Sequence, residues 1–257
     1  MDLGLRDKVA LVSGGSKGMG RAAAEELARE GARVLILARG QDAIDDTVAA
    51  IRAGGGVAEG LSVDMTDPSS IANALAHCRK CFGGEPDIAV ANVYGTARLS
   101  FDSATPDDFR TGYELLVLSA LHLAHAVVPG MKQRGWGRIV TIGSFCVKKP
   151  HWHIPLIVDN VTRAGAAALN KSLSNELGPH GITVNSIAPG FILSNPTSVA
   201  QYERYGEEGR RKLVESIATR RLGRPEDIAN GVLFFVAEES SWVTGQVLSI
   251  DGGQSIF

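Results

Sequence analysis

The chain has few cysteines and almost no net charge, and both scarcities exclude classes of protein. Three cysteines among 257 residues are an odd number, which argues against a disulfide framework. A formal net charge of −2 at pH 7 gives the composition no preference for nucleic acid or a charged membrane surface. No unbroken run of about 18 apolar residues is present, so no membrane span is expected. The first seven residues lack the features of a signal peptide, and we expect a cytoplasmic protein.

Two of the cysteines, Cys78 and Cys81, are separated by two residues and follow His77. A redox pair needs a helix N-terminus to lower a thiol pKa, whereas these residues end a helix predicted from Ser69 to Phe82. A zinc site needs two further ligands. We therefore interpret the pattern as an inert helix end and expect no metal site.

The start of the chain carries its most informative motif. A short apolar run, residues 8–12, leads directly into a glycine-rich turn, residues 13–20, and then into a strong helix former, residues 21–30. Glycines permit a tight turn, and a helix N-terminus offers free N–H groups and a positive dipole to a pyrophosphate. Strand, turn and helix in this order predict a dinucleotide-binding site; an ordinary strand-to-helix turn is the alternative.

Strands and helices alternate along the rest of the chain, which indicates a parallel sheet covered on both faces. No linker or change of composition divides residues 1–257, so we predict a single α/β domain. The expected strands are residues 8–12, 33–38, 60–63, 87–91, 137–142, 182–187 and 246–250. The expected helices are residues 21–30, 41–53, 69–82, 105–129 in two pieces, 162–177 and 225–237.

Seven segments in this order resemble the short-chain dehydrogenase/reductase family, and within it the 3-oxoacyl-carrier-protein reductases. They are residues 13–20, Asp64, Asn92, and residues 137–144, 181–190, 223–229 and 243–253. The resemblance spans Leu5 to Gly253. It implies a Rossmann-type doubly wound parallel sheet of seven strands, a nicotinamide dinucleotide cofactor, a small-molecule substrate, and a homotetramer formed through residues 116–128, residues 162–177 and the last strand.

The same resemblance assigns the cofactor-binding positions. Those for the pyrophosphate and adenosine ribose are Gly14, Ser16, Gly18, Met19 and Gly20; Asp64 and Met65 lie beside the adenine; Asn92 follows the fourth strand; and Pro189, Gly190, Ile192 and Ser194 hold the nicotinamide carboxamide.

The end of the second strand favours NADP(H) over NAD(H). An acidic residue there would bind the ribose 2′-hydroxyl and repel a 2′-phosphate. This chain has Ala38 followed by Arg39, with Lys17 in the glycine turn. Two cations and no acid favour a phosphate; solvated surface charges are the alternative.

The resemblance fails at the chemical residues, where the family uses Asn, Ser, Tyr and Lys. Alignment places Leu116, Ser144, Asp159 and Arg163 at these positions, so only the serine is kept. A free aspartate has a pKa of about 3.9, and about one in a thousand is protonated at neutral pH. Arg163, one helical turn on, lowers that fraction further. Asp159 is therefore a poor acid; a base, an anchor for a substrate cation and a plain ion pair remain open.

Other groups must then move the proton. Ser144 is the candidate for polarising a substrate oxygen. Arg163 keeps a charge that can bind the nicotinamide ribose, but it does not deprotonate and cannot relay a proton. His151 and His153 lie in the loop that borders the family's substrate pocket, and histidine titrates near neutral pH; polar surface residues are the alternative.

The stretch from residue 194 to 221 is where the family carries a substrate lid, and here it is rich in charge. Its cations suit an acidic or acyl-linked substrate, and a solvated mobile helix is the alternative.

Three functions remain. The first is an NADP(H)-dependent oxidoreductase of carbonyls or alcohols with a rebuilt proton-transfer site. The second is a non-redox isomerase, dehydratase or lyase on the same fold, and the third is a nucleotide-binding protein without catalysis.

Overall fold

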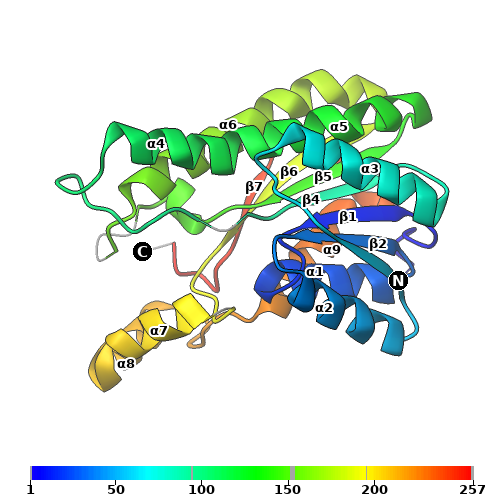
Figure 1. The fold of residues 1–257 in the computed structure, drawn as a ribbon. Helices are drawn as coiled ribbons and strands as arrows, with labels where there is room; N and C mark the ends of the chain where they lie inside the picture. Colours follow the sequence, from blue (N-terminus) through cyan, green and yellow to red (C-terminus); the bar gives the residue numbers. More distant parts are fainter. Residues whose placement is uncertain (1, 94, 151–153, 195, 256–257) are drawn as a thin grey trace.

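A parallel sheet of seven strands forms the centre of the computed structural model, which describes residues 2–93, 95–150, 154–194 and 196–255. Its order is β3-β2-β1-β4-β5-β6-β7 (Figure 1). The order reverses between β1 and β4, and ligands of such sheets bind beyond the carboxyl ends of the strands at this point. The strands are β1 (Val9–Ser13), β2 (Arg33–Ala38), β3 (Val57–Ser62), β4 (Ile88–Ala91), β5 (Gly137–Ile142), β6 (Ile182–Pro189) and β7 (Val247–Ile250).

Helices cover both faces of the sheet, so the predicted doubly wound architecture is confirmed. One face carries α1 (Gly18–Arg29), α2 (Gln41–Ala53) and α9 (Pro225–Val236) (Figure 1). The other carries α3 (Pro68–Phe82), α4 (Pro106–Tyr113), α5 (Ser119–Arg134) and α6 (Ile157–Leu177). Two further helices, α7 (Pro196–Arg204) and α8 (Gly206–Ser216), project from the body beyond the end of β6.

The sheet separates two hydrophobic clusters. Leu27 of α1 and Phe235 of α9 pack on one face with Val12 of β1, while Leu123 of α5 packs on the other with Leu11 of β1. Successive side chains of a strand point to opposite faces, so β1 needs apolar residues at every position and is buried throughout. The unbroken apolar run near the start of the sequence is the mark of such a doubly covered strand.

Four predicted boundaries were wrong by three residues or more. The first helix was expected from residue 21 and begins at Gly18, and the long helix was expected to end near residue 129 and ends at Arg134. The third strand was expected at residues 60–63 but begins at Val57, because it pairs with β2 from Arg33↔Val57 onward and the ladder overrides the weak strand preference of Ala58 and Glu59. The helix expected at residues 162–177 begins at Ile157. Its first turn therefore includes Asp159, where an acidic side chain suits the positive end of the helix dipole.

The long helical segment after β4 has an unusual centre. A π-helical turn, Glu114–Leu118, joins α4 to α5, and the helix continues past Pro129 to Arg134. In the described part of the chain, Pro106–Arg134 is the one helix long and apolar enough to cross a membrane, with a mean hydropathy of 1.5. Half of the most apolar stretch of this helix is buried in the protein, as in a helix that covers a sheet.

Candidate active site

The glycine turn after β1 is built so that two of its positions admit only glycine. Gly14 has φ +58°, and a Cβ there would lie 2.2 Å from the backbone oxygen of Asn92. Gly18 has φ +56°, and its Cβ would lie 2.7 Å from the backbone oxygen of Ser194. Side chains are disfavoured at positive φ, and neither backbone oxygen can move aside easily. The turn therefore brings three distant segments together at the carboxyl end of the sheet.

The N-terminus of α1 lies in this turn and is open to an anion. Lys17 is the N-cap residue, no described side chain caps the helix, and its first turn contains no acidic residue. The first N–H groups of a helix have no partner within the helix and carry a partial positive charge. These residues fit the pyrophosphate of a dinucleotide.

Asn92 ties β4 to the turn. Its side-chain Nδ2 donates to the backbone oxygen of Gly14 at 3.2 Å, and its backbone N–H donates to Ser13 Oγ at 3.0 Å. A Cβ on Gly20 would lie 2.5 Å from the same Nδ2. Asn92 thus holds the shape of the turn, a role that the sequence prediction of cofactor binding did not include.

The residues expected beside the adenosine lie at the ends of β2 and β3. Arg39 follows β2 and is exposed, while Met65 is buried. Asp64 Oδ1 accepts hydrogen bonds from the backbone N–H of Thr66 at 2.9 Å and from its hydroxyl at 2.7 Å. These hydrogen bonds, with a smaller contribution from the charge of Arg39, hold the pKa of Asp64 below its ordinary value. The carboxylate stays ionised and its orientation is fixed.

The nicotinamide side is formed where β6 ends. Gly190 packs against Asp251, where a Cβ would lie 2.7 Å from the Asp251 Cβ, and its N–H donates to Ile250. Ile192 forms a bridge with Gly223, and Ser194 lies against Gly18. The segment from Pro189 to Ser194 therefore packs against Gly18 of the glycine turn and against the chain that follows β7.

A buried ion pair occupies the far side of the crevice from the adenosine end. Asp159 and Arg163 of α6 pair through Oδ2 and Nε at 2.9 Å, and each side chain is only 12% exposed. Asp159 Oδ1 accepts from Thr96 twice, from the backbone N–H at 2.7 Å and from the hydroxyl at 2.9 Å. Both carboxylate oxygens are thus engaged.

These partners decide the charge of Asp159. Burial alone would raise its pKa, but the charge of Arg163 and the hydrogen bonds from Thr96 and Arg163 outweigh burial and hold the pKa below its ordinary value. Asp159 is therefore an anion at neutral pH and has no proton to give. The sequence did not point to Thr96, because it lies 63 residues away in a loop without a motif.

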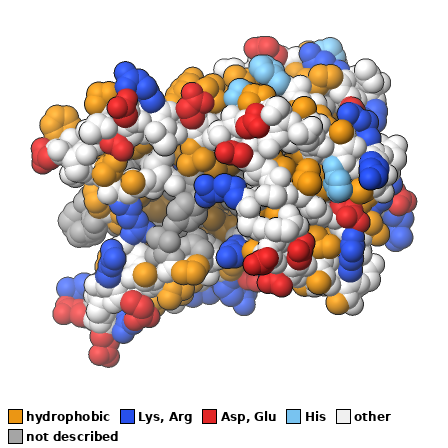
Figure 2. All heavy atoms as spheres, viewed as in Figure 1, with side chains coloured by type: hydrophobic (Ala, Val, Ile, Leu, Met, Phe, Trp, Pro, Cys, Tyr) orange, Lys and Arg blue, Asp and Glu red, His pale blue; other side chains and the backbone are white. Residues whose placement is uncertain are grey.

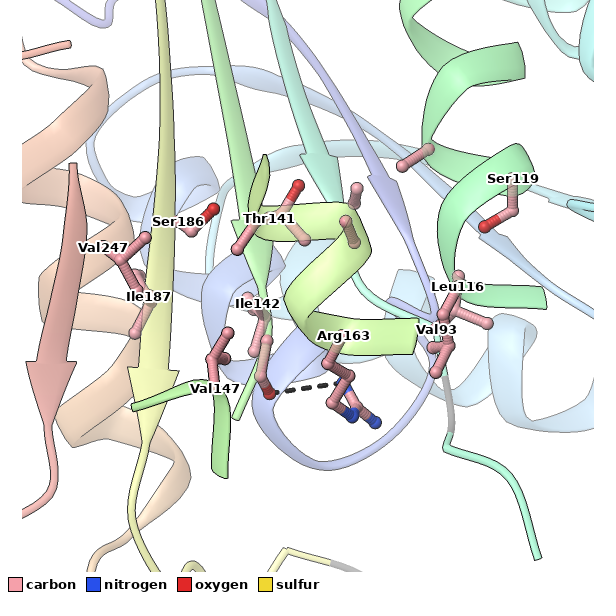
Figure 3. Close-up of a pocket in the computed structure, with 15 residues that line it drawn as sticks. Val93, Leu116, Ser119, Thr141, Ile142, Val147, Arg163, Ser186, Ile187 and Val247 are labelled. Atoms are coloured by element: carbon pink, nitrogen blue, oxygen red, sulfur yellow. Dashed lines mark hydrogen bonds between the residues drawn. The ribbon is translucent and has the colours of Figure 1, made fainter. Parts of the chain in front are cut away.

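Arg163 also reaches the pocket beside this pair. Its Nη1 donates to the backbone oxygen of Gly143 at 3.3 Å, the interaction dashed in Figure 3. Ser144 follows Gly143, and its Oγ accepts from the backbone N–H of Cys146 at 3.3 Å. Arg163 is thus fixed next to the serine that the sequence selected.

The pocket itself is mostly apolar (Figure 3). Leu116, from the π-helical turn, contributes an aliphatic side chain to it and cannot form a side-chain hydrogen bond. Ser119 donates its hydroxyl to the backbone oxygen of Leu115 at 2.5 Å, which gives that oxygen a hydrogen-bond partner within the π-helical turn. The lining residues are Ala91, Val93, Leu116, Ser119, Ala120, Thr141, Ile142, Gly143, Val147, Arg163, Ala166, Ala167, Ser186, Ile187 and Val247. His151 and His153 lie outside the described residues.

The predicted lid corresponds to α7, α8 and the segments beside them. Arg210, Arg211 and Lys212 form ion pairs with Glu203, Glu215 and Glu208. Acidic and basic side chains are accordingly interspersed on the projecting lid in Figure 2. These three cations are balanced locally, so the described geometry favours a solvated surface at these positions.

Comparisons with known proteins agree with this architecture. The family model described as enoyl-(acyl carrier protein) reductase matches residues 14–255. The chain belongs to the short-chain dehydrogenase/reductase family, whose members are NAD(P)-dependent oxidoreductases of carbonyl and alcohol groups.

Individual relatives span the whole chain. The 7α-hydroxysteroid dehydrogenase of Escherichia coli is 34% identical over 98% of this chain and 96% of its own. The 3-oxoacyl-acyl-carrier-protein reductase of the same organism is 34% identical over 96% of both chains. The crystal structure of L-sorbose reductase from Gluconobacter frateurii, complexed with NADPH and L-sorbose, is 31% identical with a TM-score of 0.90, covering 99% of this chain and 98% of that one.

Proposed function

We propose that the protein is an NADP(H)-dependent oxidoreductase that interconverts a carbonyl and an alcohol on a small molecule. The observation that carries the proposal is the glycine turn, which combines two positions that admit only glycine with an uncapped helix N-terminus. Such a turn lets a pyrophosphate come close to the backbone N–H groups at the start of α1. When bound there, the nicotinamide supplies or accepts the hydride.

The preference for NADP(H) rests on charge. Ala38 leaves the end of β2 without an acid, and Arg39 and Lys17 are both exposed beside the turn. A guanidinium forms bidentate hydrogen bonds with a phosphate. Relatives differ in this respect, since one solved relative was crystallised with NADH and another with NADPH.

The remaining chemistry divides among four groups of this chain. Ser144 donates its hydroxyl to the substrate oxygen, and Arg163 carries the positive charge that hydrogen-bonds the nicotinamide ribose. Asp159 fixes Arg163 and stays ionised. The proton is exchanged by His151 or His153, because histidine titrates near neutral pH and the Asp159–Arg163 pair does not.

Turnover of NADPH by purified protein against a panel of ketones and quinones tests the proposal. Ser144→Ala should lower kcat by about 100-fold, as loss of an oxyanion donor does, with the affinity for NADPH unchanged. Ser172→Ala, on the exposed side of α6, is the matched control and should leave both quantities unchanged. NADPH that binds but is never consumed on any substrate would contradict the redox activity.

A second candidate follows from the fixed charge of Asp159. A site with a permanent carboxylate at the position where the family carries its tyrosine suits a non-redox isomerisation or elimination in which NADP(H) serves only as a structural ligand. Consumption of substrate without a change in the absorbance of the reduced nicotinamide would distinguish this reaction. Binding of NADP(H) with no substrate consumed by any route would leave the non-catalytic nucleotide-binding protein.

Assembly into a homotetramer is the expectation for the family, and exposed apolar side chains support it here. Trp242 is 97% exposed, Phe234 of α9 49%, and Val161 of α6 56%. Apolar side chains of this size are often covered by a partner. Light scattering should give the mass of four chains, and a monomer would contradict the assembly.

A further inference from the structure

We propose that Glu59, His77 and Cys81 form a surface site for a zinc ion at the edge of the sheet. His77 and Cys81 lie four residues apart in α3, and Cys81 Sγ lies 3.4 Å from His77 Nε2. Glu59 lies in β3, the edge strand, and one ligand atom from each of the three residues lies within 4.8 Å of the other two.

These distances suit a tetrahedral ion. With Zn–S of about 2.3 Å and Zn–N of about 2.1 Å, two ligands of one tetrahedral zinc lie about 3.6 Å apart. The observed separation of Sγ and Nε2 is therefore already close to that of a metal-bound pair. The Glu59 carboxylate oxygen lies within 4.8 Å of the other two ligand atoms and has to come within about 3.5 Å of them for all three to bind one ion. Three protein ligands leave the fourth position to water.

The ligands of this site differ from those that the Cys-x-x-Cys pattern in the sequence would suggest, because Cys78 is not among them. Cys78 is buried, and its Sγ donates to the backbone oxygen of Gly84 at 3.5 Å. A thiol enclosed in this way is not open to an ion at the surface. The third ligand comes instead from a strand 18 residues before His77, which residue spacing within the helix could not reveal.

The charges around the site are mixed: Arg79 and Lys80 in the last turn of α3 and Arg52 beside Glu59 oppose a cation, whereas the helix end favours one. The last turn of a helix carries a partial negative charge, and His77 and Cys81 lie in the last two turns of α3. Arg52 pairs with one oxygen of Glu59, which leaves the second oxygen for a metal. Arg52 also donates through Nε to Ala58 at 2.9 Å, so it can hold the carboxylate in place as an outer-shell partner does.

Position defines what the ion would do. The chain after α3 returns to the start of β1, where the backbone N–H of Asp87 donates to Val9. The proposed site thus lies towards the amino ends of the strands, whereas the glycine turn lies at their carboxyl ends. An ion there would fasten the edge strand β3 to α3 and stabilise the fold without entering the reaction.

Titration of the chelator-treated, reduced protein with Co²⁺ alone and then Zn²⁺ alone tests the site. One equivalent of Co²⁺ should give a thiolate-to-metal charge-transfer band, and Zn²⁺ should abolish the band and raise the melting temperature. Cys81→Ser should remove the band. His77→Gln and Glu59→Gln should each lower the affinity for the metal by at least about 100-fold, since loss of an outer-shell partner alone costs about 10–100-fold in affinity.

His180→Gln removes a histidine outside the cluster and should change nothing. The metal-free variants should melt as the metal-free parent does, because Cys81 is exposed and Glu59 and His77 are partly so. The absence of a charge-transfer band, or its survival in Cys81→Ser, would overturn the proposal. NADPH binding by the metal-free protein should be unchanged, so failure here and failure of the oxidoreductase proposal are distinguishable.

Discussion

The two ends of the crevice are built differently, one from backbone and the other from side chains. At the glycine turn, the ligand-binding shape is made by backbone: positive φ at Gly14 and Gly18, and the open N-terminus of α1. At the Asp159–Arg163 pair it is made by side chains that four hydrogen bonds hold in place. A backbone cradle can be kept while side chains at the opposite end change, so one fold can keep its cofactor and acquire another chemistry.

The largest effect should come from breaking the backbone end. Gly14→Ala places a methyl group 2.2 Å from a backbone oxygen at φ +58°, so the turn must open. We expect NADPH binding to be lost and unfolding to become easier by about 3 kcal/mol. Calorimetric titration and urea denaturation measure the two quantities.

Gly178→Ala is the matched control, because Gly178 has helical φ and ψ and its Cβ would meet nothing within 4 Å. It should leave both quantities unchanged. A Gly14→Ala protein that still binds NADPH tightly would contradict the role of the glycine turn as the NADPH-binding site.

The second-largest effect should come from disrupting the Asp159–Arg163 pair. Asp159→Ala leaves the guanidinium of Arg163 without its counter-ion at 12% exposure, and we expect a loss of about 3 kcal/mol in the free energy of unfolding. Asp107→Ala removes a similar helix pair with Arg110 in which the aspartate is 87% exposed, and it should cost nothing measurable. Equal effects of the two substitutions in urea denaturation would contradict the structural role of the buried pair.

A smaller effect should separate the two cofactors. Arg39→Ala removes the proposed partner of the 2′-phosphate, and we expect about a tenfold loss of affinity for NADPH, or about 1.4 kcal/mol. The affinity for NADH should stay unchanged because NADH lacks that phosphate. Arg29→Ala at the far end of α1 is the control, and a parallel loss for both cofactors would refute the assignment.

The smallest effect concerns pH. The pKa of Asp159 is lower in the folded protein than its ordinary value of about 3.9. Its ionised form therefore adds stability above that value, and this contribution is lost as the pH falls through the lower, folded pKa. The melting-temperature advantage over Asp159→Asn should be constant near neutral pH and shrink below pH about 4. An advantage that grows on acidification would show the opposite direction of shift.

Much of the backbone end could be predicted from the sequence because its signals are local. The run of residues 8–12, the glycines after it and the helix former beyond them are consecutive, and six of the seven strands were found within two residues of their bounds. β3 was the exception, because Ala58 and Glu59 become strand through pairing with β2.

The side-chain end resisted prediction because its partners are distant. The sequence identified Asp159 and Arg163 as a pair one turn apart, and that pair is present. It gave no sign of Thr96, of the π-helical turn at Leu116, or of α6 beginning at Ile157. Each depends on how the loop after β4 packs against α6, which no local pattern encodes. Glu59 beside His77 and Cys81 is the same kind of contact.

The early start of α6 has one further consequence. Because Asp159 lies in the first turn and Arg163 in the second, the two side chains pair and the pKa of Asp159 stays below its ordinary value, so its carboxylate exchanges no proton near neutral pH. The ionising group responsible for any rise or fall of kcat near neutral pH must then lie elsewhere in the protein. A titration curve of turnover would therefore report the ionisation of the true proton carrier alone, undisturbed by this neighbour.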